Sequence, residues 1–467
     1  MKPLLRNALS AAGGDAGSRL VGFFISVYLA RTLSPSGFGM IGIGLAILGY
    51  QVLLASPGIL LVETRNVAAG PGVDHRRVGG VLALRLSLSL LLWLATWAFA
   101  WTVFGGSSWA DITVLYACSL LPLAFLLDWF FQGKEDFARV ALSRLVSSCV
   151  YALVLVLAVR SPGDLYAVPL AFCAGNAASA AYLFLSYRRR YGSPGFEWEP
   201  GRWGTILKEN LPAGLASLLG HSVMNLPPIV IGLALGTAEA GLFGAAMKIV
   251  FSALVADRLL NALLLPALTR QYPLGGEHLS RLVETALKAL ALVLLPALLA
   301  GIWCAEPVME LVFGSAYVQA ASVLAVLAGY VGCTVLNSVL VSTLVAGGKE
   351  ALFSRIMMVS AGLQALLLVP LTAASGITGA AWAVVAGEAV AFVLLARAVE
   401  MSMPISITRV LARPLLAGIP MMLWLVFSRD MPPFLSVPVS VVLFGVAATA
   451  FGVFRREEMR YLKEKLV

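Results

Sequence analysis

The chain has 467 residues, of which 60% are hydrophobic and 12% are charged, and its formal net charge is +9. A soluble globular domain carries about 25% charged residues, so this composition excludes one. The apolar residues suffice for roughly fourteen membrane spans of about 20 residues each, and the positive charge would indicate nucleic-acid binding only if it formed a soluble basic patch.

Fourteen apolar segments follow one another along the chain, and each is predicted to be a transmembrane helix. They cover residues 8–30, 37–61, 78–104, 111–131, 140–159, 165–186, 209–235, 241–264, 282–304, 320–344, 353–373, 377–399, 410–428 and 435–454. The expected fold is therefore an all-α polytopic membrane protein with 14 transmembrane helices. The first segment superficially resembles a signal peptide, but Asp15 and Arg19 interrupt its apolar run, so we expect it to be retained.

Lysine and arginine are distributed unequally between the two sides of this arrangement. Twenty-five of the 33 lie in, or within a turn of, the loops on the side of the two termini, and five lie inside spans. The other side has only Arg31, Arg160 and Arg429. This asymmetry follows the positive-inside rule and predicts that both termini are cytoplasmic. The basic residues therefore set the orientation of the chain in the membrane, and we expect no nucleic acid among the partners.

The sequence contains no pattern typical of an enzyme or of a cofactor site. Its five cysteines lie in apolar runs and have neither disulfide nor zinc-ligand spacing. There is no glycine-rich phosphate loop followed by Lys and Ser or Thr. The longest external connection, residues 305–319, is short and offers no polar cleft for catalysis. We therefore expect a transporter without a metal or a cofactor, and not an enzyme.

Short matches in the same order relate spans one to six to spans seven to twelve. The pairs are Leu29-Ala30 with Leu233-Ala234, Gly37-Phe38 with Gly241-Leu242, Val103-Phe104-Gly105 with Val312-Phe313-Gly314, Gly133-Lys134-Glu135 with Gly348-Lys349-Glu350, and Ala174-Gly175-Asn176-Ala177 with Ala386-Gly387-Glu388-Ala389. Two halves of six spans enter the membrane in the same direction. The repeat thus predicts a pseudo-two-fold axis along the membrane normal, with a transport site between the halves.

The repeat also sets the expected domain organisation. We predict an N-lobe of spans one to six over residues 1–190, a cytoplasmic linker over 191–208 and a C-lobe of spans seven to twelve over 209–400. Spans thirteen and fourteen, with a cytoplasmic tail, occupy residues 401–467 and lie outside the repeat. The expected architecture is two lobes of six spans each, followed by two further spans.

Two cations lie deep inside predicted spans, where an ionisable group costs roughly 2.5–3.5 kcal/mol. Arg19 is about 16 Å into span one and shares a helix face with Asp15. It either pairs with Asp15 or faces a central cavity. Lys248 is roughly 10 Å into span eight and has no acidic residue within four positions. It either reaches the outer surface along its aliphatic stem or faces the same cavity.

Other intramembrane polar residues suggest cavity-lining or coupling roles. Ser217, His221 and Asn225 recur every four residues on span seven and precede two prolines, which suggests a broken, cavity-lining helix. Glu388 lies midway through span twelve and is either a proton carrier or cation ligand, or a neutral hydrogen-bonded packing residue. We interpret Arg85 as a residue that extends to the cytoplasmic surface, and Asn337 as a packing or lining group.

Several of these segments resemble the polysaccharide-transporter flippases of the multidrug/oligosaccharidyl-lipid/polysaccharide exporter superfamily. The resemblance covers nearly the whole chain and depends on Arg19 in span one, the Leu29-Ala30…Gly37-Phe38-Gly39 junction, the Gly241…Gly244-Ala245-Ala246…Lys248 stretch, and Phe313-Gly314…Tyr317…Ala320. It implies a V-shaped pair of six-helix lobes that works by alternating access.

The resemblance also implies a substrate, a location and a set of partners. The substrate would be an undecaprenyl-pyrophosphate-linked oligosaccharide of lipopolysaccharide or exopolysaccharide synthesis, moved to the periplasmic leaflet of a bacterial inner membrane. Arg19 and Lys248 match the cationic positions of the family, and cations suit a pyrophosphate. Membrane lipids, a polysaccharide polymerase and glycosyltransferases would be its partners, and the protein would be a monomer.

Two alternatives stay open. A cation-coupled multidrug antiporter of the same superfamily would depend on acidic groups such as Asp15 and Glu388 more than on cations. A non-transporting scaffold of a polysaccharide export complex would leave the buried charges unexplained. Spans thirteen and fourteen favour the flippase branches over the twelve-span antiporters.

Overall fold

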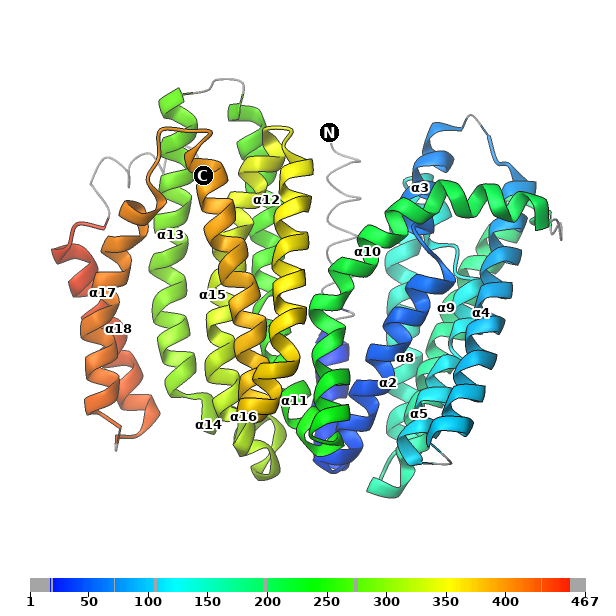
Figure 1. Cartoon of the computed structure of the whole chain (residues 1–467), viewed down its shortest axis with the longest axis horizontal. Coiled ribbons are helices and arrows are strands. Elements are labelled where there is room, and N and C mark those ends of the chain that lie inside the picture. The colour runs from blue at the N-terminus through cyan, green and yellow to red at the C-terminus, as the bar shows by residue number, and fades with distance from the viewer. Residues whose placement is uncertain are drawn as a thin grey trace. The chain divides into compact units, whose positions relative to one another are not determined.

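A computed structural model describes residue 17 and residues 20–70, 72–104, 107–195, 200–272, 276–429 and 431–453. Throughout these residues the regular structure is helical and includes no strand. Ten of the described helices are long and apolar enough to cross a membrane (Figure 1). The predicted all-α polytopic membrane fold is confirmed.

Each predicted span contains described helical residues, and two features change how spans eight, eleven and twelve are divided into helices. Spans eleven and twelve are joined in α16 (Glu350–Glu400), which departs from helical geometry only at Ser375 and Gly376. Span eight is divided at Leu254 into two helices of 17 residues, α11 (Thr237–Ala253) and α12 (Val255–Gln271).

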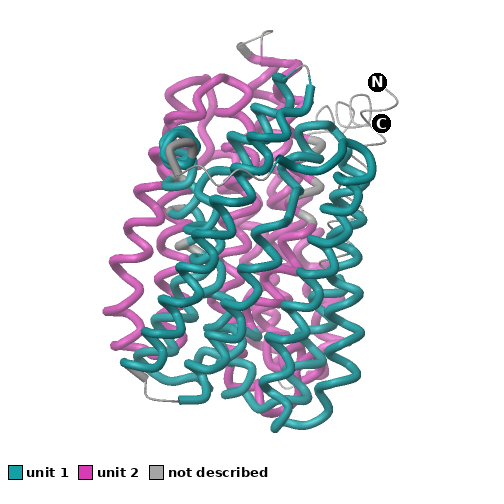
Figure 2. The backbone as a smooth tube through the Cα atoms, turned by 90° about the vertical axis from the view of Figure 1, so that its right-hand side faces the viewer, with its two compact units in different colours: residues 1–245 teal, residues 246–467 magenta. Residues whose placement is uncertain are grey.

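The chain divides into two compact units, unit 1 with residues 1–245 and unit 2 with residues 246–467 (Figure 2). This division falls inside α11, whereas the predicted lobes are separated by the linker 191–208. The difference arises because α10 (Pro200–Ala234) packs along α2 (Pro35–Ala55), so the seventh span belongs to unit 1. The organisation into six-span lobes stays a prediction.

Glycines allow α10 to lie directly against the turn that follows α2. A Cβ atom at Gly214 would lie 2.7 Å from the Cβ of Pro57, and a Cβ at Gly58 would overlap the carbonyl oxygen of Asn210. Gly58 also has a φ of +66°, which side chains other than glycine rarely adopt. Small residues at such crossings let helix backbones approach closely, and here they fix the position of α10 within unit 1.

The remaining helices of unit 1 surround a core of large side chains. They are α3 (Ile59–Ala69), α4 (His75–Phe104), α5 (Ser108–Ala117), α6 (Leu120–Ala124), α7 (Asp128–Gly133), α8 (Phe137–Ala158) and α9 (Ala167–Tyr191). Trp129 and Phe130 of α7 pack with Tyr187 of α9 in this core. The predicted fourth span, 111–131, is not one helix but the succession α5, α6 and α7.

Unit 2 is built around α15 (Ala321–Ala346), which packs against α12, α16 and α13 (Gly276–Trp303). The short helix α14 (Ala305–Phe313) precedes α15. The last two helices, α17 (Ile407–Phe427) and α18 (Pro433–Ala450), pack against each other and against α13. The Nε1 of Trp303 donates a hydrogen bond to the carbonyl oxygen of Leu425 at 2.9 Å and so ties α13 to α17.

Candidate functional site

The polar face predicted on span seven lies on α10. Ser217 and His221 are exposed and Asn225 is half-buried. The Ser217 hydroxyl donates to the carbonyl oxygen of Ala213 at 2.9 Å, and the Asn225 amide nitrogen lies 3.3 Å from the Nδ1 of His221.

The predicted break of span seven at its two prolines is wrong. Pro227 and Pro228 lie inside α10, which remains one helix through Ala234 (Figure 1). A proline removes one backbone donor and favours a bend, and α10 is visibly bent along its course (Figure 1).

His221 lines a cavity of about 440 Å³ within unit 1, most of whose lining is aliphatic and aromatic. Arg85 of α4, Asp128 of α7 and Asn176 of α9 also line it, together with the rings of Trp129 and Phe172. We call it the α7–α10 cavity. Sequence analysis had selected only His221 as a lining residue; the helix packing brings the other polar side chains to it.

Arg85 does not extend to the membrane surface, which corrects the interpretation made from the sequence. Its side chain is buried, and its guanidinium donates to the Ser56 hydroxyl at 2.8 Å and to the carbonyl oxygens of Leu126 at 2.7 Å and Leu123 at 2.6 Å. Leu123 lies near the end of α6 and Leu126 in the interruption between α6 and α7. The Leu123 carbonyl also accepts from the backbone N–H of Leu126 at 3.1 Å, and Arg85 adds a charged donor to both carbonyls.

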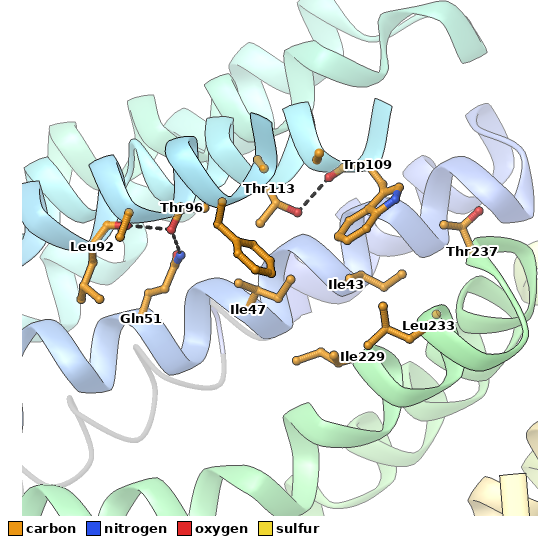
Figure 3. A pocket seen from close by; sticks show the side chains of 15 residues that line it. Ile43, Ile47, Gln51, Leu92, Thr96, Trp109, Thr113, Ile229, Leu233 and Thr237 are labelled. Carbon is orange, nitrogen blue, oxygen red and sulfur yellow. Dashed lines mark hydrogen bonds between the residues drawn. The ribbon is translucent and has the colours of Figure 1, made fainter. Parts of the chain in front are cut away.

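A larger cavity of unit 1, about 620 Å³, lies between α2, α4, α5 and α10 (Figure 3). Its lining is mostly aliphatic and aromatic and includes no charged side chain. Thr113 donates to the carbonyl oxygen of Trp109 at 2.8 Å, and the Gln51 amide donates to Thr96 at 2.5 Å (Figure 3). This cavity therefore suits an apolar group better than a charged headgroup.

The two predicted cationic residues differ in what the structure describes of them. Asp15 and Arg19 lie outside the described residues. Lys248 lies on α11 and is partly buried. The Ser252 hydroxyl donates to its backbone oxygen at 2.9 Å, but its ammonium makes no ion pair or hydrogen bond with any residue in the described ranges. Whether Arg19 and Lys248 face one cavity stays a prediction.

Glu388 is buried on α16 and is hydrogen-bonded to a neighbouring helix of unit 2. Its Oε1 accepts from the Nδ2 of Asn337 on α15 at 2.8 Å. Nearby, the Asn261 amide donates to the buried carboxylate of Asp257 at 3.2 Å, and the Ser342 hydroxyl donates to Asn261 at 3.1 Å. Asn337 was interpreted as packing or lining from the sequence, which gave no sign of its pairing with Glu388.

A third polar group, at the start of α4, was not identified from the sequence. Arg77 donates from Nε and Nη2 to the two carboxylate oxygens of Glu63, both at 2.8 Å. The Asn210 amide of α10 donates to the same carboxylate at 3.1 Å, and Arg77 also binds Glu209 at 2.6 Å. Burial raises the pKa of Glu63, but the bonds from Arg77 and Asn210 hold the pKa of this carboxyl below its ordinary value.

Metal coordination finds no support in the described part of the chain. No group of three or more His, Cys, Asp or Glu side chains in it is arranged to hold a metal ion.

A family model described as polysaccharide biosynthesis protein matches residues 4–270, more than half of the chain. The chain belongs to this family. The resemblance to polysaccharide transporters noted in the sequence is thereby confirmed for the family. A comparison with curated proteins finds no match.

Solved structures share the fold of this member of the polysaccharide biosynthesis protein family. One is described as lipid II flippase MurJ in an inward closed conformation, with a TM-score of 0.78 and 11% identity over 96% of this chain and 99% of that chain. A multidrug resistance MATE transporter of the MOP superfamily in an inward-facing conformation has a TM-score of 0.61 and 19% identity over 84% and 95%. A Vibrio cholerae MATE transporter has a TM-score of 0.51 and 15% identity over 85% and 95%.

These low identities establish the fold and leave the substrate open. The fold is shared with structures described as a lipid II flippase and as multidrug transporters, and the protein is a multi-pass membrane protein. Both flippase and multidrug-transporter structures share the fold, so the sites must distinguish them.

Proposed function

We propose that this member of the polysaccharide biosynthesis protein family is a lipid-linked oligosaccharide flippase. It moves an undecaprenyl-pyrophosphate-linked repeat unit of a lipopolysaccharide or exopolysaccharide to the periplasmic leaflet of the bacterial inner membrane. The two lobes open alternately to either side. The family match and the fold shared with a structure described as a lipid II flippase support this substrate class.

Lys248 is the observation that carries the proposal. It is a partly buried ammonium on a membrane helix, and it has no acidic partner among the residues that the structure describes. Such a charge is costly inside a membrane unless a counter-charge reaches it. The pyrophosphate of the substrate supplies that counter-charge through charge-assisted hydrogen bonds, and we assign Arg19 the same role.

The charge distribution of the loops supports an orientation with both termini in the cytoplasm. In this orientation the substrate enters from the leaflet in which it is assembled. A polysaccharide polymerase and glycosyltransferases would act after and before the flippase, and the transporter itself would work as a monomer.

Glu388 is the proposed coupling residue. It is buried, and Asn337 holds its carboxyl group, so uptake of a proton or a cation changes the charge inside unit 2. Asp15, Ser217, His221 and Asn225 are the further lining or coupling candidates. Transport that depends on a proton or sodium gradient would identify Glu388 as the place where the gradient acts.

A cation-coupled multidrug antiporter is the second candidate function, and the buried Glu388 favours it. The two functions differ in the charge of the substrate. An antiporter of cationic drugs needs acidic binding groups, whereas a pyrophosphate needs Arg19 and Lys248.

The test is reconstitution into proteoliposomes with fluorescent undecaprenyl-pyrophosphate-linked oligosaccharides and, separately, a cationic drug. We expect translocation of the lipid-linked glycan, abolished by Arg19→Ala and by Lys248→Ala although both variants insert normally. Lys208→Ala, which removes an exposed ammonium at the start of α10, is the matched control and should transport as the wild type does. If both cavity variants transported at the wild-type rate, or if only the drug moved, the proposal would be wrong.

A further inference from the structure

The α7–α10 cavity contains polar side chains that the proposed pyrophosphate site does not use: the basic Arg85, the acidic Asp128, and the amide and imidazole of Asn176 and His221. The Arg85 guanidinium already donates to Ser56, Leu123 and Leu126, and the Asp128 carboxyl group accepts from the backbone N–H of Trp129. An inorganic cation would meet Arg85, and an anionic phosphate would meet Asp128. A neutral ligand avoids both repulsions.

The hydrogen-bonding groups of this cavity include donors and acceptors in a mixed arrangement. The Asn225 amide lies 3.3 Å from the Nδ1 of His221, so we assign Nδ1 as the acceptor and Nε2 as the N–H donor. The Asn176 amide nitrogen donates to the carbonyl oxygen of Phe172 at 2.9 Å, which leaves the Asn176 Oδ1 as an acceptor. A ligand that matches both must itself donate and accept, as each hydroxyl group does.

Aromatic rings complete the lining. Phe172 and Trp129 both line the cavity, and Trp129 is almost fully buried. The ring faces and the aliphatic side chains that make up most of the lining suit the C–H surface of a pyranose, and the few polar side chains suit its hydroxyl groups.

The position of the cavity within unit 1 also suits a substrate. Arg85 lies ten residues after the first residue of α4, about 15 Å along the helix axis, and therefore deep in the membrane-spanning part. Transporters built from repeats place their substrate sites near the bilayer midplane at the interface between the repeats; this cavity shares that depth, although all of its lining residues belong to unit 1. His221 is exposed, so one wall of the cavity is accessible to a ligand.

We propose that the α7–α10 cavity binds one sugar ring of the lipid-linked glycan, with Asn176 and His221 bonding its hydroxyl groups. This subsite rests on the proposed flippase function and extends it, because it would select the glycan while Arg19 and Lys248 hold the pyrophosphate. The ligand class is a neutral pyranose.

The experiment measures binding to the purified full-length protein in detergent, and translocation in proteoliposomes. The probes are undecaprenyl pyrophosphate without a sugar and the same lipid carrying one hexose or one N-acetylhexosamine. Asn176→Leu and His221→Phe should each weaken binding of a glycosylated probe about tenfold, because a site built to bond hydroxyl groups loses those bonds, and should leave the sugar-free probe unchanged. Thr113→Val, in the apolar cavity of Figure 3, is the matched control because its hydroxyl bonds only its own helix.

The outcomes separate the subsite from the proposed function. If the wild type binds a glycosylated probe more tightly than the sugar-free lipid in a way that depends on Asn176 and His221, the subsite stands, even if nothing is translocated and the flippase function fails. If no glycosylated probe binds more tightly than the sugar-free lipid, the subsite is refuted. The subsite would also be refuted if both variants bound the glycosylated and the sugar-free probes with equally reduced affinity, or if neither variant lost affinity. Either result would count whether or not translocation is observed.

Discussion

Gly39 and Gly241 make the same contact in opposite directions. A Cβ at Gly39 would overlap the carbonyl oxygen of Thr237, and a Cβ at Gly241 would overlap the carbonyl oxygen of Pro35. Each carbonyl belongs to the residue four positions before the other glycine. The start of α2 and the start of α11 therefore make equivalent contacts with each other. A local two-fold axis between the two helices produces such a pair of equivalent contacts. The sequence match paired Gly37 with Gly241, so this contact shifts the pairing by two residues.

Replacing Gly39 by alanine should destabilise this crossing by about 1–3 kcal/mol, because the added methyl group meets backbone that cannot rotate away. A lower apparent melting temperature of the detergent-solubilised protein and a slower translocation rate are the expected results. Gly42→Ala, on the same helix, is the control, since a Cβ there meets nothing within 4 Å. Equal melting temperatures for the two variants would contradict the tight contact.

The fold could be predicted largely from local hydropathy. Apolar length identifies helices such as α2 and α18 because the membrane requires internally bonded backbone. The breaks inside spans could not be predicted in this way: the 111–131 span divides into α5, α6 and α7, whereas α10 continues as one helix through Pro227 and Pro228. A hydropathy window contains no tertiary packing and registers neither feature.

Replacing Glu63 by glutamine should lower stability at neutral pH by about 1–3 kcal/mol, because Arg77 loses its ionised partner. α3 lies outside the membrane-spanning helices, and the pKa of the Glu63 carboxyl is lowered in the folded protein. A lowered folded-state pKa stabilises the protein above the unfolded-state value of about 4.5. This contribution is lost as the pH falls through the folded-state pKa.

Melting curves between neutral pH and acidic pH measure this contribution. The difference in melting temperature between wild type and Glu63→Gln should be largest above about pH 5 and shrink below the unfolded-state pKa. Glu277→Gln is the control: its pair with Arg281 is exposed, and exposed pairs contribute about 0–1 kcal/mol. A pH-independent difference would show that ionisation of Glu63 does not stabilise the fold.

Residues of the candidate sites could be predicted from the sequence only where a single charged side chain interrupts an apolar span. Glu388 and Lys248 are recognisable from sequence because a charge in an apolar span is costly. Asn337 and Glu63 were not, since their importance comes from partners that lie 51 and 14 positions away in the chain. Arg85 was misinterpreted for a related reason: the carbonyl groups that it bonds lie near the interruption of the fourth span, which the sequence did not show.

Replacing Arg85 by lysine should destabilise unit 1, although the charge is kept. The planar guanidinium reaches Ser56, Leu123 and Leu126 at once, and one ammonium cannot match that geometry. We expect a loss of about 1–3 kcal/mol from the hydrogen bonds that are lost, measured as a lower melting temperature. Arg409→Lys, at an exposed position of α17, should melt as the wild type does; if Arg85→Lys did the same, the bonding role would be refuted.

Replacing Glu388 by glutamine should reduce the dependence of transport on a proton or sodium gradient. The glutamine carbonyl oxygen can still accept from Asn337, so the 2.8 Å hydrogen bond has an uncharged equivalent and the packing of α15 against α16 is kept. The variant cannot ionise, and a gradient then has no charge to act on at this position. Translocation rates measured with and without an imposed gradient should differ less in Glu388→Gln than in the wild type or in Glu306→Gln, which removes an exposed carboxylate at the start of α14. An unchanged gradient dependence in Glu388→Gln, with normal insertion, would reduce Glu388 to a packing residue and leave the coupling to another group.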